Sequence, residues 1–318
     1  MKYLDQTKRN WRAAGIAGLA CALIATELLG APPQTGQSSY ASPELAVAAM
    51  REAVKSGDAN ALRSVFGPAI GQISNPDPAQ HAKNMATFAK RLSEFVGLSK
   101  REDGTLVVLL GEEHWPFPIP LTMANGQWYF DTLAGQQEIL NRRLGANELS
   151  AIEVCHAYVD AQRQYMLKDY DGNGVMEYAQ RMQSSPGKKD GLYWETAPGD
   201  EESPFGPLVT KATEDGYSNR SLSAARSKHD PFHGYFFRIL KKQGGDAPGG
   251  KYDYVINGHM VAGFAFLAYP AEWGNTGVMT FIVNQRGKVY QKNLGEKTEE
   301  LAKAIDEYNP DDTWKPAE

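Results

Sequence analysis

Cysteine is scarce in this sequence, which has Cys21 and Cys155 among its 318 residues. Cys21 lies in an N-terminal segment that we expect to be removed on export, so the mature chain would keep Cys155 alone. A single cysteine cannot form an intramolecular disulfide. Stability must therefore come from packing or from a bound metal. Cys155 falls on the apolar face of a predicted helix, where a small packed hydrophobic residue is expected rather than a nucleophile.

The sequence also lacks a second long apolar run. The run that it has, Ala13–Leu29, contains only Thr26 and Glu27 as clearly polar residues. Its length of about seventeen residues is at the lower limit for crossing a bilayer. Basic residues precede it at Lys2, Lys8, Arg9 and Arg12. This layout predicts a secretory signal and a periplasmic or secreted protein, with no integral membrane domain in the mature chain.

A cleavage site for that signal is expected at Ser39 to Ala41, where small residues stand at the first and third positions. Residues 1–41 are therefore assigned to a signal peptide, with an uncleaved N-terminal anchor as the alternative. The segment Gly18 to Cys21 is a partial match to a lipoprotein signal, but the apolar run continues beyond the cysteine.

Excess positive charge is absent as well. Without residues 1–41 the chain has 29 Lys and Arg against 36 Asp and Glu, a net charge of −7. A mildly acidic surface argues against nucleic acid as a partner. With 42% hydrophobic and 22% charged residues the composition is that of a globular protein. About 277 mature residues are enough for two domains, each with its own core.

The first domain is predicted to begin with three helices. Ser42 can cap a helix with Pro43 at its first position, and Gly57 would end it. Asp58 can cap a short second helix, and apolar residues at spacings of three and four predict a third over Ala79–Phe95. These signals place all three helices before any strong strand.

Strands are predicted after the helices. Thr105–Leu110 is a continuous, β-branched run, and Ile119–Met123 pairs with Gln127–Asp131 through Asn125-Gly126, a strong hairpin signal. Helices followed by antiparallel strands predict an α+β domain over residues 42–145. The order resembles the cone-shaped nuclear-transport-factor-2-like folds, a resemblance that implies a small-ligand site in the mouth of the cone.

Aromatic residues near the strands are the candidate lining of that mouth. They are Trp115, Phe117 and Trp128, with prolines alternating with apolar groups over Trp115–Pro120. The alternative is an edge strand that proline protects from aggregation, which the pattern favours.

Acid–base chemistry has one candidate group before that run, Glu112, Glu113 and His114. An envelope hydrolase that uses these residues with a partner from the second domain is the alternative function. Adjacent glutamates in a loop are more often solvated. A non-enzymatic protein is therefore preferred.

A domain boundary is predicted at residues 145–147, where Gly145 would end one helix and Asn147 would cap the next. The second domain is assigned to residues 146–318. On its helix Glu153, His156 and Asp160 share one face, yet no zinc-binding spacing is present. An ordinary hydrogen-bonded surface is the expected interpretation.

The most informative motif follows this helix, with oxygen-bearing side chains at alternate positions of a short loop. The expected calcium ligands are the side chains of Asp169, Asp171, Asn173 and Glu177 and the carbonyl of Val175. Gly174 would supply the sharp turn, and Gln180 stands where an EF-hand has a bidentate glutamate. Weak calcium binding is expected. A plain turn between elements is the alternative, because Asp-Gly and Asn-Gly pairs form turns without an ion.

The remainder predicts a helix over Gly206–Asp215, a meander of antiparallel strands and a closing helix over Thr298–Tyr308. The strands are expected in His233–Leu240, Tyr252–Ile256, Val261–Tyr269, Val278–Asn284 and Lys288–Lys292. His229, His233 and His259 could converge in space, but we expect them to be strand-end residues.

A long helix, the D-Y-D-G-N-G loop, Glu177 to Ala179 and His233 to Tyr235 resemble the globular heads of type IV pilins and pseudopilins. That resemblance implies a calcium-supported α+β head. Pilins carry their apolar assembly helix directly joined to this helix, whereas here the apolar run is more than a hundred residues away.

The mature chain as a whole resembles the bacterial domain of unknown function 2950. The matching stretches are Trp115 to Pro120, Asn147 to Leu149, Asp171 to Gly174, Glu177 to Ala179, Gly191 to Trp194, Tyr252 to Tyr254 and Gly277 to Asn284. The resemblance implies no activity. The sequence thus predicts an exported, two-domain α+β protein that acts as a binding or assembly module, with calcium as its cofactor and an envelope protein or small ligand as its partner.

Overall fold

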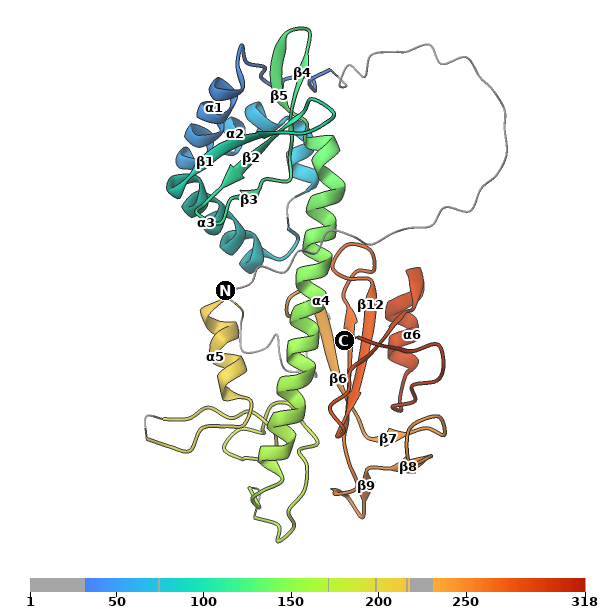
Figure 1. Ribbon diagram of the computed structural model, residues 1–318. Coiled ribbons are helices and arrows are strands. Elements are labelled where there is room, and N and C mark those ends of the chain that lie inside the picture. Colours follow the sequence, from blue (N-terminus) through green and yellow to red (C-terminus); the bar gives the residue numbers. More distant parts are fainter. Residues whose placement is uncertain are drawn as a thin grey trace, which may run out of the picture.

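The computed structural model describes residues 32–73, 75–170, 172–197, 199–215, 217 and 231–317 (Figure 1). Its helices are α1 (Pro43–Ser56), α2 (Ala59–Phe66), α3 (Pro78–Glu94), α4 (Thr132–Tyr165), α5 (Gly206–Glu214) and α6 (Thr298–Ala304), with 3₁₀ turns η1 (Pro68–Gln72) and η2 (Gly295–Lys297). The first strands are β1 (Val96–Lys100), β2 (Leu106–Leu110), β3 (Trp115–Pro116), β4 (Leu121–Ala124) and β5 (Gln127–Phe130). The later strands are β6 (Tyr235–Leu240), β7 (Lys242–Gln243), β8 (Tyr252–Asp253), β9 (Val255–Ile256), β10 (His259–Met260), β11 (Ala265–Pro270), β12 (Met279–Asn284), β13 (Tyr290–Asn293) and β14 (Lys315–Pro316).

The described residues form a mixed α+β structure with two separate clusters of buried apolar side chains. We call the part from α1 to β5, with the first half of α4, the N-terminal lobe. The C-terminal lobe runs from the second half of α4 to β14. In Figure 1 the lobes lie at opposite ends of α4.

The first two helices of the N-terminal lobe begin at their expected caps, and α3 lies one residue before its expected range of Ala79–Phe95. Ser42 Oγ accepts a hydrogen bond from the Leu45 amide, and Gly57 ends α1 in the left-handed conformation with φ of 65°. Asp58 caps α2 by accepting a bond from the Asn60 amide. Asp77 caps α3 in the same way. Local capping chemistry therefore determined these boundaries correctly.

The N-terminal sheet has the strand order β1-β2-β4-β5, with β3 paired to β2. The predicted hairpin is confirmed: β4 pairs with β5 around Asn125 and Gly126, both at positive φ. Strand β1 was not predicted; it follows α3 directly and pairs with β2. Gly97 interrupts the apolar pattern of β1 and weakens its signal.

Helix α4 is continuous over Thr132–Tyr165, so the predicted helix end at Gly145 and new cap at Asn147 are wrong. Glycine costs a helix about 1 kcal/mol relative to alanine, which regular turns on both sides can offset. Asn147 is buried instead of capping, and its Nδ2 donates to the Thr276 carbonyl at 2.8 Å. The helix therefore connects the two lobes as one rigid segment.

The C-terminal sheet has the strand order β14-β13-β12-β11-β6, with antiparallel neighbours. Helix α4 packs on one face, where Tyr158 stacks on Phe266 with ring centroids 4.0 Å apart. Helix α6 lies on the opposite face (Figure 1), and Arg238 of β6 donates hydrogen bonds to the carbonyls of Ala302 and of Ile305, the residue that caps the end of α6. The core of this lobe thus lies between the sheet and α4.

Four of the five predicted strands lie side by side in the large sheet as β6, β11, β12 and β13. The segment Tyr252–Ile256 lies outside the large sheet, because β8 pairs with β7 and β9 pairs with β10 in two small hairpins. Strand β6 then pairs directly with β11. The closing helix ends at Ala304, and the chain returns as β14 to the edge of the sheet at β13.

In the part of the chain that the structure describes, no helix combines the length and apolar character needed to cross a bilayer. The predicted signal run Ala13–Leu29 lies outside the described residues, as do Asp171 and His229.

Candidate functional site

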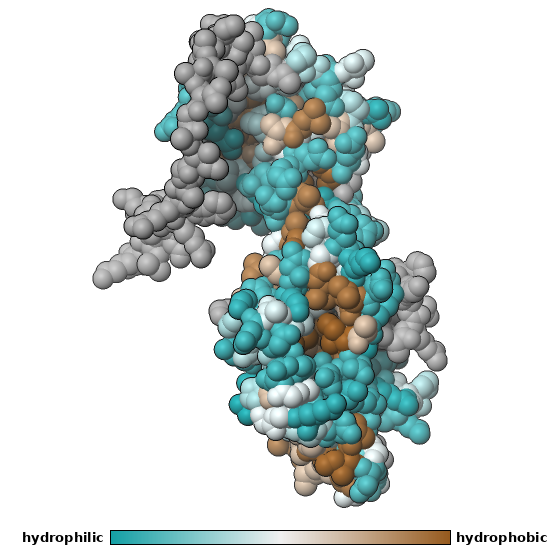
Figure 2. Space-filling view, turned by 90° about the vertical axis from the view of Figure 1, so that its right-hand side faces the viewer, coloured by the Kyte–Doolittle hydropathy of each residue, from teal (hydrophilic) through white to brown (hydrophobic). Residues whose placement is uncertain are grey.

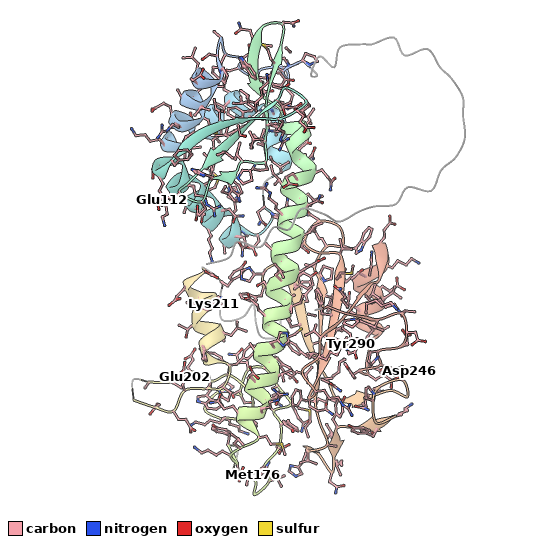
Figure 3. The ribbon with its side chains drawn as sticks, viewed as in Figure 1. Glu112, Met176, Glu202, Lys211, Asp246 and Tyr290 are labelled. Carbon is pink, nitrogen blue, oxygen red and sulfur yellow. The ribbon has the colours of Figure 1, made fainter. Side chains whose placement is uncertain are left out.

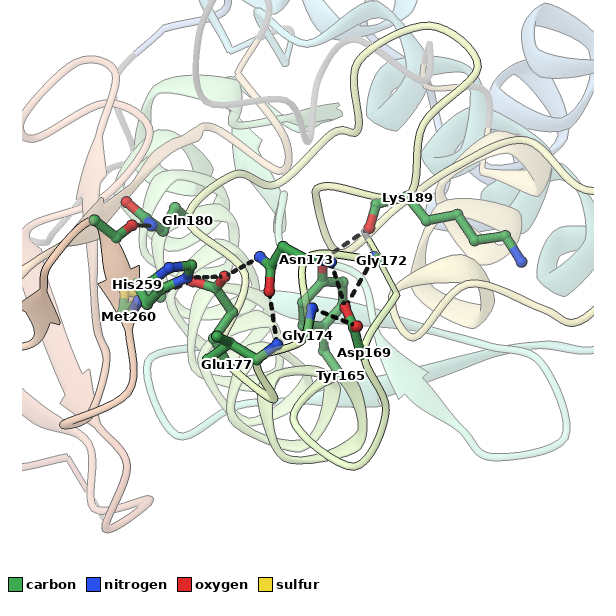
Figure 4. Close-up of polar contacts among 12 residues, drawn as sticks. Tyr165, Asp169, Gly172, Asn173, Gly174, Glu177, Gln180, Lys189, His259 and Met260 are labelled. Atoms are coloured by element: carbon green, nitrogen blue, oxygen red, sulfur yellow. Dashed lines mark hydrogen bonds and ion pairs between the residues drawn. The ribbon is translucent and has the colours of Figure 1, made fainter.

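The predicted cation loop lies directly after α4 and is organised by the carboxylate of Asp169 (Figure 4). Asp169 Oδ1 accepts hydrogen bonds from the amides of Gly172 and Asn173, at 2.8 and 3.1 Å. Asp169 Oδ2 accepts a bond from the Gly174 amide at 2.8 Å. Gly174 has φ of 85°, a conformation that side chains strongly disfavour. Three amides therefore face one carboxylate, and the loop is wrapped around its first residue.

Glu177 connects this loop to the hairpin β9–β10. Its Oε1 accepts bonds from His259 Nδ1 and from Asn173 Nδ2, both at 2.8 Å, and its Oε2 accepts a bond from the Met260 amide at 2.9 Å. Burial acts to raise the pKa of Glu177, but these donors outweigh it and leave the pKa below its ordinary value. The buried carboxylate is therefore ionised and holds two distant segments together.

Asn173 is a further predicted ligand, and Gln180 stands where an EF-hand has its glutamate. Asn173 Oδ1 accepts a bond from the Val175 amide at 2.8 Å, so its side chain folds back over the loop. Gln180 donates from Nε2 to the Gly258 carbonyl, and its Oε1 accepts a bond from Lys241 Nζ. Among the described residues no group of three His, Cys, Asp or Glu side chains is arranged to hold a metal. Asp171 is not among them, so the cation loop stays a prediction.

The candidate acid–base residues of the N-terminal lobe lie at its surface. Glu112, Glu113 and His114 are all exposed on the turn between β2 and β3, and Figure 3 shows Glu112 at the outer edge of the lobe. Glu113 forms an ion pair with Arg91 at 3.7 Å, and the His114 ring packs on Phe95. Among the described residues, none of these side chains bonds to His233 or His259.

The three aromatic residues predicted to line a ligand site have different surroundings. Phe117 is buried in the N-terminal core, 5.1 Å from the ring of Phe88. Trp115 is half-buried between the guanidinium groups of Arg91 and Arg142, at 4.9 and 4.8 Å from its ring centroid. Trp128 lies on β5, where its backbone pairs with Tyr40. The short β3 pairs with β2, as the edge-strand interpretation predicted.

The candidate cluster on α4 is an ordinary surface. Glu153 pairs with Lys211 of α5, and Asp160 pairs with Arg163 one turn further along the helix. Cys155 is fully buried, and burial raises the pKa of its thiol. The expectation of a packed cysteine is confirmed.

Sequence reasoning missed a polar cluster where the two lobes meet. Tyr217 donates its hydroxyl hydrogen to Asp77 Oδ2 at 2.7 Å, and Gln80 donates to His233 Nδ1. Lys83 pairs with Asp215 at 2.5 Å. Asp77 caps α3, and Gln80 and Lys83 lie on it, whereas their partners come from the C-terminal lobe. These contacts join the two lobes in addition to α4.

Burial determines the protonation of this cluster. Burial lowers the pKa of His233, although Asp215 and Asp77 act in the opposite direction. Burial together with the neighbouring Asp77 raises the pKa of Tyr217. Both groups are therefore neutral near pH 7, as their hydrogen bonds require. The only sequence signal was the Asp77 cap, because its partners lie more than a hundred residues away.

Comparison with known proteins gives one result. The family model described as "Protein of unknown function (DUF2950)" matches residues 37–317. Neither the curated proteins nor the solved structures contain a match. The match covers both lobes and the whole of α4. The chain therefore belongs to the DUF2950 family, proteins of unknown function.

Proposed function

We propose that this chain is an exported, non-enzymatic binding or assembly module of the cell envelope, braced by calcium at the loop of residues 169–177. Export is inferred from the basic N-terminus and the apolar run Ala13–Leu29. The observation that carries the calcium proposal is the wrapping of three backbone amides around Asp169. These amides close the loop on Asp169, the first of the proposed ligands.

Calcium would be held by Asp169, Asp171, Asn173 and the carbonyl of Val175, with Glu177 as a further oxygen donor. The ion would neutralise carboxylates that otherwise repel each other across a short loop. Both oxygens of Glu177 already accept hydrogen bonds from protein donors. Incomplete ligation favours weak affinity, with Kd on the order of 10⁻⁴ to 10⁻³ M, as in extracellular modules.

The C-terminal lobe would act as a pilin-like head. This proposal is supported by the packing of the second half of α4 on β11 and β12, and by the position of the loop at the end of that helix. The exposed turn at Glu112 to His114 supports a role that does not depend on acid–base chemistry there.

Thermal melting with millimolar calcium, compared with a chelator control, tests the metal proposal. A ligand that binds only the folded state raises Tm. We expect calcium to raise Tm of the wild type, and Asp171→Ala to abolish the rise. Asp312→Ala, an exposed aspartate of the C-terminal segment, is the matched control and should keep the full response. A wild-type Tm that calcium leaves unchanged would refute the metal proposal and identify the loop as a plain turn.

The binding role is tested separately by identifying proteins that co-purify from envelope extracts. A specific partner that is retained with the wild type supports a binding module. Turnover of an envelope substrate that is lost in Glu113→Gln would instead establish the hydrolase alternative.

A further inference from the structure

A groove of about 480 Å³ lies on the C-terminal lobe, far from the cation loop. Its floor is Ile282, which is 1% exposed, and its walls include Leu294, Leu301, Ile305 and Trp314. Leu301 is 43% exposed although it is a large apolar side chain. Figure 2 shows hydrophobic residues gathered in a hollow on this side of the lobe. The groove is therefore an apolar surface that the described residues leave uncovered.

The groove exists because the C-terminal strand separates from the sheet. Strand β14 is in register with only the first half of β13, through Tyr290 with Pro316 and Gln291 with Lys315. Before β14 the amide of Trp314 bonds to the Asp311 carbonyl within a turn instead of extending the ladder. In the described structure, Lys292 and Asn293 thus have a strand neighbour on the β12 side alone.

Backbone N–H and C=O groups of successive residues in a strand point to opposite sides. This alternation shows which residues of β13 direct these groups toward the side where β14 pairs. The Ala317 amide donates to the Val289 carbonyl, so Val289 directs its backbone groups toward the β14 side. Residues two apart along a strand point the same way, and Gln291 and Asn293 therefore do so as well. Beyond the end of β14 the backbone of Asn293 meets the groove. An exposed strand edge of this kind is a template for another strand.

The charges around the groove favour a basic occupant. On the β13 side, the Lys292 ammonium group lies over the Trp314 ring at 5.8 Å. On the opposite side Asp306 and Glu307 line the groove, and Asp306 pairs with Lys242 at 2.8 Å. Arg238 also acts on Asp306, so Glu307 is the carboxylate on that side that a basic group of an occupant would meet.

We propose that this groove binds an extended peptide, which adds a strand to β13 beside Lys292 and Asn293. Aliphatic side chains at alternate peptide positions enter the space between Leu294, Leu301 and Ile305, and a lysine or arginine of the peptide faces Glu307. In this mode of recognition the backbone hydrogen bonds supply affinity and the side-chain pockets supply specificity. The inference rests on the proposal that the chain is a binding module, and it names the class of partner.

Selection of short peptides from a display library on the purified protein tests the proposal. We expect the enriched peptides to share alternating aliphatic residues and a basic residue. Affinity of the best peptide is then measured by fluorescence anisotropy against Leu301→Lys, with Leu133→Lys as the matched control, since Leu133 is 53% exposed on α4. Leu301→Lys should weaken binding by at least about tenfold, and Leu133→Lys should leave it unchanged. Melting curves of both variants verify that they are folded.

Two further measurements address the mode of binding. Methylation of the peptide amides that face β13 should abolish binding, because the added strand needs those donors. Glu307→Lys should weaken the basic peptide and favour one in which glutamate replaces the basic residue. Equal affinity of Leu301→Lys and wild type, or full binding of the methylated peptide, would overturn the proposal. An envelope partner whose binding does not depend on Leu301 would overturn the groove proposal while the binding-module proposal stands.

Discussion

The N-terminal lobe places most of its residues in helices and strands, whereas the C-terminal lobe leaves the described residues between 166 and 205 outside both. The first lobe is stabilised by a continuous apolar cluster around Phe66, Phe117 and Phe130. The second fixes its loops with single buried polar side chains, such as Gln162 and Glu177. Buried backbone groups outside regular elements need such partners. Removal of a buried polar side chain should therefore destabilise the C-terminal lobe much more than the N-terminal lobe.

The largest effect is expected from Phe117→Ala in the N-terminal lobe. Phe117 is 7% exposed and contacts the rings of Phe66 and Phe88. Its removal should lower the free energy of unfolding by about 4 kcal/mol through lost burial and a cavity. Denaturant unfolding measures this, with Met123→Ala at a 49% exposed position of β4 as the control. If Phe117→Ala loses no more free energy of unfolding than the control, Phe117 does not stabilise the core, and its predicted role as a ligand contact stands.

Gln162→Ala is expected to have the next largest effect, and it acts on the C-terminal lobe. Gln162 is fully buried, bonds to both the amide and the carbonyl of Ala179, and donates to the Tyr158 hydroxyl. Loss of these partners should cost about 3 kcal/mol, because the backbone of Ala179 stays buried and unpaired. Hydrogen exchange should show faster opening after residue 166 and unchanged protection in α1. The exposed Gln164→Ala is the control, and uniform destabilisation of both lobes would contradict the comparison.

Glu177→Gln is expected to weaken the link between the loop and β10 by about 2 kcal/mol, since hydrogen bonds to a charged acceptor are lost. The folded-state pKa of Glu177 is lowered. Its ionised form therefore stabilises the protein above the ordinary glutamate pKa of 4.5, and this stability is lost as pH falls through the folded-state pKa. Melting at a series of pH values should show a smaller loss of Tm below about pH 4.5 in the variant than in the wild type. If Tm falls with pH by the same amount in the variant and in the wild type, Glu177 does not contribute to acid sensitivity.

Tyr217→Phe should have the smallest effect, about 1 kcal/mol, because it removes one hydrogen bond between the lobes and retains the ring. The Asp77 carboxylate keeps its bonds to the amides at the start of α3. Small-angle scattering checks whether the orientation of the lobes changes, which the continuous α4 should prevent. A large change in shape would show that the Tyr217 contact, and not α4, determines the arrangement of the lobes.

Sequence analysis succeeded where the signal was local. Ser42, Asp58 and the Asn125-Gly126 turn each act on neighbouring residues, and the structure confirms the elements that they predict. It failed at Gly145, where packing and the flanking turns outweigh a local helix-breaking tendency. It also missed the role of Glu177, since His259 is 82 residues away and no pattern of neighbouring residues encodes the pair.

Calorimetric titration of calcium into the chelator-treated protein measures whether the loop of residues 169–177 binds the ion. We expect one site with Kd of about 10⁻⁴ to 10⁻³ M. Asp169→Ala should remove this site, because Asp169 organises the loop. Heats that do not exceed those of dilution for the wild type, or an unchanged site in Asp169→Ala, would contradict a calcium-braced C-terminal lobe.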